Sequence, residues 1–275
     1  MARGEPCAVP DVASPAYAKV QTVQGIQSKQ AKPAPRKRLP GLSVKDGYTQ
    51  HPFDARFGVK TSGLVAGRHL VSGHPHDRHA TAYFGVAPSV FQSLVKRWQK
   101  SRPAAQRSHT TFVDLGAGMG RAVLLASELG FKASIGVELH GGLARTARKN
   151  GSIWRAAGRG APIRIVRGDA VEFSLPPGPV LVFLFNPFAA PVLRRLLKAW
   201  RANPGRKGRE LDILYVNNEQ EDVLLRERGW TRVYFGKVRR SAEDAIADYR
   251  IMANQPDGEY ASSNCEDCSI WRWVG

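Results

Sequence analysis

Beyond residue 110, short uninterrupted apolar runs alternate with stretches in which apolar residues recur at helical spacing. Residues 180–185 (Val-Leu-Val-Phe-Leu-Phe) form one such run, which is typical of a strand buried on both faces of a sheet. The apolar residues that follow recur at the spacing of one helix face: Val192, Leu193, Leu196, Leu197 and Trp200. The pattern therefore predicts alternating strands and helices.

Seven strands are predicted in this region, at residues 111–113, 133–137, 163–166, 180–185, 211–216, 231–235 and 249–252. Strands that alternate with helices predict an α/β fold, here a doubly wound, mainly parallel seven-stranded sheet with helices on both faces. Only a short polar loop separates the last two strands. We therefore expect them to form a hairpin that places the last strand antiparallel.

The chain before residue 110 has a different character. Residues 1–43 are rich in Ala, Pro, Gln and Lys without sustained periodicity, which predicts a disordered basic tail. Residues 44–109 form an irregular lead-in with one helix, which begins at Pro88 and continues to about residue 100 with apolar residues at helical spacing. The α/β domain is then expected at 110–254, followed by a C-terminal extension at 255–275.

The net charge of +18, from 41 Lys and Arg against 23 Asp and Glu, favours anionic partners such as RNA, DNA or acidic proteins. A general bias toward Arg is the alternative explanation. No apolar run reaches the ~18–20 residues of a membrane span, and the N-terminus lacks the apolar block of a secretory signal. We expect a soluble, cytoplasmic protein without a membrane partner.

No metal site is predicted from the cysteines or histidines. Cys265 and Cys268 form a lone Cys-x-x-Cys without the two further ligands that a zinc site needs. Four histidines lie close in sequence, but their spacings do not match a helical ligand pair: His69, His74, His76 and His79.

A glycine-rich turn is the strongest chemical signal. Residues 114–120 (Asp-Leu-Gly-Ala-Gly-Met-Gly) join a strand to a helix, and their glycines permit backbone angles and close approaches that other residues forbid. A dinucleotide fingerprint would need its third glycine where Arg121 stands. Asp114 would also repel a pyrophosphate, whereas S-adenosylmethionine has no phosphate and carries cationic groups.

Two acids follow the next two strands. Glu138 ends the strand at 133–137, where a carboxylate can accept hydrogen bonds from both ribose hydroxyls. Asp169, in Gly168-Asp169-Ala170, follows the next strand and can accept a hydrogen bond from an adenine amino group. The alternatives are a surface carboxylate for Glu138 and a turn or capping role for Asp169.

Asn186, Pro187 and Phe188 follow the apolar run, at the carboxyl edge of the sheet where ligands bind in such folds. The Asn186 side chain offers an acceptor and donors, and its carbonyl could orient a target amine. Phe188 could pack against a flat substrate or a lysine stem. We take these three as candidate catalytic residues, with a simple strand-to-helix turn as the alternative.

The order Asp-x-Gly-x-Gly-x-Gly, Glu, Gly-Asp-Ala and Asn-Pro-Phe resembles the class I, seven-strand S-adenosylmethionine-dependent methyltransferases over residues 83–253. The resemblance implies a Rossmann-like fold and S-adenosylmethionine as methyl donor. It implies these cofactor-binding residues: Asp114, Gly116, Ala117, Gly118 and Gly120 around the methionine part, Glu138 at the ribose, and Asp169 and Ala170 at the adenine. Residues 83–88 also resemble a segment of some lysine methyltransferases, which makes Tyr83 a candidate lid over the cofactor.

Asn186-Pro187-Phe188 is similar to the Asn-Pro-Pro-Tyr/Phe motif of enzymes that methylate amines in nucleic acids, although it lacks one proline. We therefore expect an N-methyltransferase that acts on a macromolecular amine, either a protein lysine or an RNA or DNA base. Two other classes stay open at this point. One is a basic RNA-binding protein whose Rossmann-like fold holds cofactor without turnover, and the other is a nicotinamide-dependent oxidoreductase.

Overall fold

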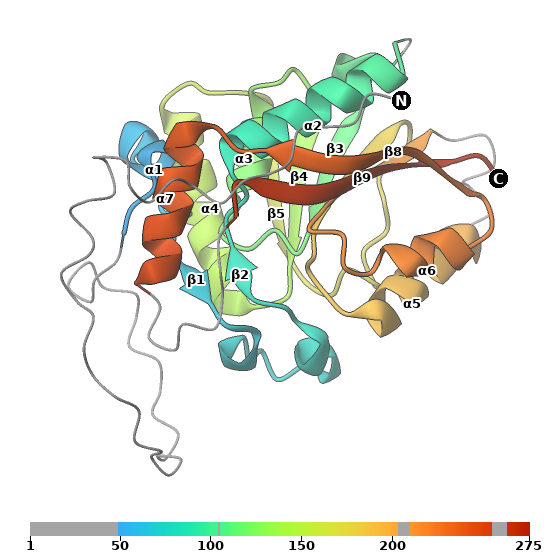
Figure 1. Ribbon diagram of the computed structural model, residues 1–275, viewed down its shortest axis with the longest axis horizontal. Coiled ribbons are helices and arrows are strands. Elements are labelled where there is room, and N and C mark those ends of the chain that lie inside the picture. Colours follow the sequence, from blue (N-terminus) through green and yellow to red (C-terminus); the bar gives the residue numbers. More distant parts are fainter. Residues whose placement is uncertain (1–48, 104, 203–209, 255–262) are drawn as a thin grey trace.

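The computed structural model describes residues 49–103, 105–202, 210–254 and 263–275, and Figure 1 shows how they are arranged. The predicted tail at 1–43 lies outside these residues. The helices are α1 (Pro52–Phe57), α2 (Pro88–Ser101), α3 (Arg121–Ser127), α4 (Gly141–Ala156), α5 (Ala190–Ala202), α6 (Glu221–Arg226) and α7 (Ala242–Ala253), with short 3-10 helices η1 (Gly67–His69), η2 (Pro75–His79) and η3 (Arg107–His109). No helix in the described part of the chain has the length and apolar character to cross a bilayer.

The strands form one large and one small sheet. They are β1 (Leu64–Val65), β2 (Tyr83–Phe84), β3 (Thr111–Leu115), β4 (Ala133–Glu138), β5 (Ile163–Arg167), β6 (Val180–Phe185), β7 (Leu211–Val216), β8 (Trp230–Arg239) and β9 (Cys265–Trp273). The large sheet has seven strands in the order β5-β4-β3-β6-β7-β9-β8, and β1 pairs with β2 in the small one. Strands β3 to β7 are parallel, and β9 runs antiparallel to both of its neighbours. This confirms the predicted doubly wound, mainly parallel seven-stranded sheet with an antiparallel last strand. The predicted short-loop hairpin is wrong, because α7 lies between β8 and β9 in the chain.

Helices cover both faces of this sheet (Figure 1). One apolar core joins α2, α3 and α4 to the first face, and a second joins α5 and α6 to the other. The central strands β3 and β7 are buried at every residue, as expected for parallel strands between two helical layers. The edge strand β5 instead exposes Arg164 and Arg167, and such charges on an edge discourage pairing with another chain.

The strand predicted at residues 249–252 was wrong. These residues lie in α7, whose first turn is capped by Ser241, because the Ser241 hydroxyl accepts a hydrogen bond from the Asp244 backbone N–H at 3.2 Å. A four-residue apolar run does not distinguish a strand from a buried helix face. The polar loop before it held the missed signal, which was a capping serine followed three residues later by an acid.

The last strand is β9, and it comes from the segment that was expected to be an extension outside the domain. Its Ile270 and Trp271 are fully buried, and the free thiol of Cys268 is buried with them, which raises the pKa of that thiol. Asp212 on β7 links this strand to α2, because it accepts hydrogen bonds from Arg272 Nε on β9 at 3.1 Å and from Trp98 Nε1 on α2 at 2.7 Å. The α/β domain therefore extends to the end of the described chain.

Candidate functional site

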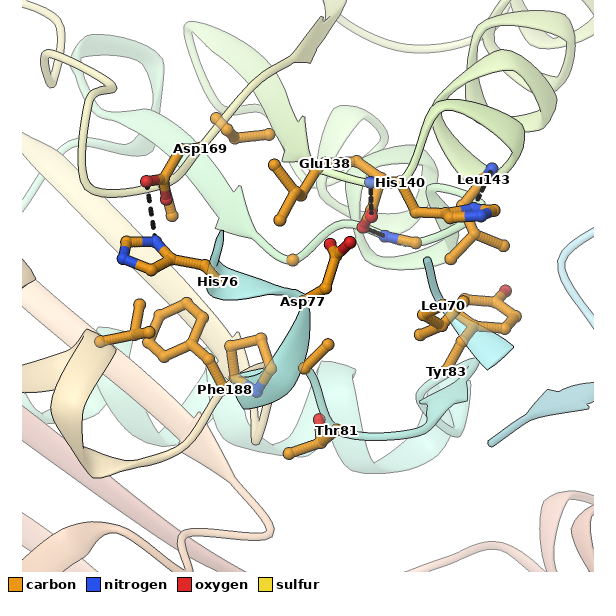
Figure 2. A pocket seen from close by; sticks show the side chains of 18 of the residues that line it. Leu70, His76, Asp77, Thr81, Tyr83, Glu138, His140, Leu143, Asp169 and Phe188 are labelled. Atoms are coloured by element: carbon orange, nitrogen blue, oxygen red, sulfur yellow. Dashed lines mark hydrogen bonds and ion pairs between the residues drawn. The ribbon is translucent and has the colours of Figure 1, made fainter. Parts of the chain in front are cut away.

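A pocket lies at the carboxyl ends of β3, β4, β5 and β6, where a doubly wound sheet binds its ligands (Figure 2). Residues 70–84, which we call the strap, close it from one side. Most of the predicted site residues line this pocket: Tyr83, Gly116, Gly118, Glu138, Asp169, Ala170, Pro187 and Phe188. The other four predicted residues are not part of the lining: Ala117 and Asn186 directly adjoin lining residues in the chain, and Asp114 and Gly120 are each two residues away from one.

The glycine turn is packed tightly between the strap and the loop after β6. Gly118 has φ +54°, and a Cβ atom there would lie 2.1 Å from Cε2 of Tyr83. Gly116 has φ +83°, and a Cβ atom there would lie 2.3 Å from Cβ of Pro187. The predicted lid residue and one predicted catalytic residue therefore press on the same turn, at two positions where only glycine fits.

Gly118→Ala should weaken binding of S-adenosylhomocysteine, the demethylated product, by at least about tenfold, because left-handed strain adds to the collision with Tyr83. Gly158→Ala is the matched control. Gly158 also has a positive φ, +66°, but nothing lies within 4 Å of its Cβ position. Titration calorimetry should show no loss of affinity in the control. Equal losses in the two variants would assign the effect to backbone strain alone.

Glu138 fastens the glycine turn to the start of α4. Its two carboxylate oxygens accept hydrogen bonds from the backbone N–H groups of Gly118 and His140, each at 2.7 Å. Burial raises the pKa of Glu138, and these backbone donors pull it back down. The carboxylate is therefore fixed at the pocket wall, and its remaining lone pairs are available to ribose hydroxyls.

Asp114 is buried beneath the turn and close to Glu138. Burial, and then the charge of Glu138, raises the pKa of Asp114 well above its ordinary value. Two buried acids side by side repel each other in their ionised forms. A cationic ligand beside them would relieve this repulsion. The two carboxylates therefore fit the ammonium and sulfonium groups of S-adenosylmethionine and would repel a pyrophosphate.

Asp169 is held by the strap as well as by its own turn. Its Oδ2 lies 2.9 Å from Nδ1 of His76, and its Oδ1 accepts a hydrogen bond from the Val171 N–H at 3.0 Å (Figure 2). The turn-capping role and a pocket-lining position therefore coexist. The other ring nitrogen of His76 lies 2.9 Å from Nη1 of Arg195. This arrangement places the imidazole proton on Nδ1, facing the carboxylate.

His74, His76 and Asp169 bring potential metal-ligand atoms within 4.8 Å of one another. Sequence spacing missed this grouping, because Asp169 comes from a distant loop. A metal at Nδ1 of His76 would displace the proton between His76 and Asp169 and would leave an N–H group facing the Arg195 guanidinium. We therefore interpret the grouping as a polar contact that attaches the strap to the loop after β5, rather than as a metal centre.

Asn186 directly follows β6 and has a left-handed backbone, with φ +39°. Its side chain is buried, and its Oδ1 has no hydrogen-bond partner among the residues that the structure describes. Its backbone carbonyl accepts a hydrogen bond from the Thr81 hydroxyl of the strap. A buried acceptor without a partner is costly, and in a native protein it calls for an explanation such as a ligand.

The strap supplies pocket residues that the sequence did not reveal. Asp77 lines the pocket and accepts hydrogen bonds from Ser72, Gly73 and His74; these outweigh its partial burial and lower its pKa. His140 lines it from the start of α4 and accepts the Leu143 N–H at Nδ1. Its cap position was the one local signal that could have indicated it.

One comparison with known proteins covers part of this site in the sequence. The sequence model of the family described as histone methylation protein DOT1 matches residues 85–159, the stretch that contains the glycine turn, Glu138 and α4. The sheet order and the antiparallel β9 are those of the class I methyltransferase fold. The chain is a class I S-adenosylmethionine-dependent methyltransferase.

The match covers well under half of the methyltransferase, so it does not place the chain in the DOT1 family. A search of curated proteins found no match. Among solved structures, the methyltransferase is similar to a proposed RNA methyltransferase from Pyrococcus horikoshii, with 17% identity, a TM-score of 0.44, and coverage of 67% of this chain and 81% of that one. It is also similar to magnesium protoporphyrin IX methyltransferase from Synechocystis PCC 6803, with 10% identity, a TM-score of 0.40, and coverage of 66% and 79%. Similarities this low add nothing about the acceptor.

Proposed function

We propose that this methyltransferase transfers the methyl group to an amine nitrogen of a macromolecule. The observation that carries the proposal is the buried, unpartnered Oδ1 of Asn186, next to two pocket-lining residues, Phe185 and Pro187. An acceptor oxygen in that position can bind an amine N–H and hold the nitrogen lone pair toward the methyl group. The similarity of Asn-Pro-Phe to amine-methylating motifs supports the same role.

The bound cofactor supplies a methyl group already activated by the positive charge of its sulfonium. Asp114, Glu138 and Asp169 would hold it, and the turn at Gly116 and Gly118 would bring backbone close to it. Pro187 and Phe188 wall the pocket and exclude water from the reacting groups. Alignment and desolvation are then the main contributions of this chain, since an in-line displacement needs no covalent intermediate on the protein.

Two acceptor classes have separate support. The matching family is described by histone methylation, which favours a protein amine. The Asn-Pro-Phe motif favours an amine of a nucleic-acid base. Transfer of labelled methyl from S-adenosylmethionine into a cell extract, followed by separation of protein, RNA, DNA and small molecules, distinguishes the two.

Asn186→Gly should lower the rate of this methyl transfer by about 100-fold, because it removes the acceptor oxygen while glycine keeps the left-handed backbone. Binding of S-adenosylhomocysteine should change little. Asn217→Gly is the matched control, because Asn217 also has a left-handed backbone, with φ +48°, and follows β7, where neither of its neighbours in the chain lines the pocket. A wild-type protein that binds cofactor and labels no fraction would contradict the proposed activity.

A further inference from the structure

The charges of the pocket and of its rim have opposite signs. The acids Asp77, Glu138 and Asp169 line the pocket, and Asp114 is buried close to Glu138. These acids suit a cationic cofactor. Arginines from four different elements contact pocket-lining residues or their neighbours, or act on them through their charge, and this positive charge requires a separate explanation.

Two of these arginines lie on the side of α4. Arg167, at the end of β5, approaches the start of α4, because its Nε lies 3.1 Å from the position that a Cβ of Gly141 would take. Arg145 is in the first turns of α4. Both arginines act electrostatically on the pocket-lining His140, whose pKa is lowered by burial first and then by their charges, against an opposite effect of Asp77.

The other two lie on the side of the strap and α5. Arg195 contacts the pocket-lining His76 at 2.9 Å, and Arg78 on η2 lies 3.3 Å from His79. The charges of both arginines act on His79. We call the four residues the arginine rim: Arg78, Arg145, Arg167 and Arg195.

The arginine rim is not paired with acids, although the pocket-lining Asp77, next to Arg78 in the chain, adds one negative charge that also acts on His140. All four side chains belong to exposed residues, and none has a carboxylate within salt-bridge distance among the residues that the structure describes. The surrounding sequence explains this. Residues 139–202, which contain α4, β5 and α5, carry eleven Lys or Arg and only two acids, Asp169 and Glu172. Asp169 is buried at the pocket wall and engaged by His76.

We propose that the arginine rim binds the phosphates of a single-stranded nucleic acid and lays the strand across the mouth of the pocket. Guanidinium groups match phosphate oxygens with two parallel hydrogen bonds, and their spacing around a cleft suits a chain of regularly repeated anions. Phe188 at the pocket wall offers a ring on which a base can stack. A free cationic lysine segment would be repelled by the same rim.

The role of this strand as the source of the acceptor amine rests on the proposed function, but its binding does not. The experiment therefore measures binding without methyl transfer. The full chain is titrated into a fluorescent single-stranded RNA of about 20 nucleotides, between about 50 and 200 mM salt, and affinity is followed by anisotropy. The test variant is Arg78→Gln/Arg145→Gln/Arg167→Gln, which leaves Arg195 and its contact with His76 intact.

The control variant removes the same charge elsewhere, with Lys96→Gln/Lys100→Gln/Arg239→Gln on exposed positions of α2 and β8. The rim variant should bind RNA at least about tenfold more weakly, and its plot of log affinity against log salt should be shallower by about two units, since three phosphate contacts are lost. The control should stay within about threefold of wild type, and both variants should bind S-adenosylhomocysteine.

Three results would overturn the proposal. The first is equal RNA affinity in the rim variant and the wild type, and the second is an equal loss in the rim and control variants. The third is competition by poly-glutamate as strong as competition by unlabelled RNA, which would assign the rim to an acidic protein. A rim variant that loses RNA while the wild type labels no RNA or DNA would keep the binding surface and refute only the proposed acceptor.

Discussion

Glu138→Gln is expected to weaken binding of S-adenosylhomocysteine by about 100-fold. Each carboxylate oxygen of Glu138 accepts a backbone N–H, from Gly118 and from His140, both at 2.7 Å. An amide has a single acceptor oxygen, so its NH₂ group would face one of these N–H groups. The variant loses one charge-assisted hydrogen bond, worth about 1.5–3 kcal/mol, and the negative charge that we propose to accept the ribose hydroxyls is lost as well.

Titration calorimetry with S-adenosylhomocysteine measures this loss, and Glu172→Gln is the control. Glu172 is an exposed acid three residues after Asp169, and it does not line the pocket. Its replacement changes the net charge by the same amount without touching the pocket lining. If both variants bind S-adenosylhomocysteine with equal affinity, the carboxylate of Glu138 contributes only as a general negative charge. Its assignment to the ribose hydroxyls would then be wrong.

The parts of the site that could be predicted are those fixed by local geometry. A buried strand that ends in a glycine turn places Gly116 and Gly118 at the carboxyl edge of the sheet, and Glu138 follows because β4 is the parallel neighbour of β3. No knowledge of the rest of the chain is needed for these assignments. The same reasoning found Asn186 at the end of β6.

The strap could not be predicted in this way, because distant contacts position it. Thr81 donates to the carbonyl of Asn186, which lies 105 residues further along the chain. Ala80 pairs with Phe188 in an isolated bridge, and His76 reaches Asp169. The irregular lead-in contains no periodicity that would announce these contacts. The sequence offered its histidines only as possible metal ligands. In the structure, His76 contacts Asp169 and so joins the strap to the pocket wall.

The wrong prediction of the last strand, at residues 249–252 instead of β9, has a related cause. A nine-residue strand that lies antiparallel between β7 and β8 can carry acids at its start, because Glu266 and Asp267 pair with cations of neighbouring residues. Because of these acids, the first half of β9 does not form an apolar run. The second half, Ile270 to Trp273, is too short to predict a strand without the first half.

Arg121→Leu is expected to lower the free energy of unfolding by about 3–5 kcal/mol. Arg121 stands where a dinucleotide fingerprint would have its third glycine, and in the structure it has a buried structural role. Its guanidinium is buried at 2% exposure and donates to the carbonyls of Thr61, Gly85 and Val86. It also lies 4.0 Å from the buried Asp54 carboxylate. Leucine would remove this donor from all three carbonyls, of which Thr61 would keep Tyr83, and would remove a buried cation beside Asp54.

The same change should weaken cofactor binding, because the lid depends on this network. The Tyr83 hydroxyl donates to the Thr61 carbonyl at 2.8 Å, and Arg121 Nη2 donates to the same oxygen at 3.1 Å. Urea unfolding measures the stability, and Arg155→Leu, at an exposed position of α4, is the control. If Arg121→Leu does not fold, Arg121→Lys should still do so with an intermediate loss, because a lysine keeps the charge and gives up the fork of donors. A loss no larger in Arg121→Leu than in Arg155→Leu would show that the buried network does not stabilise the lead-in.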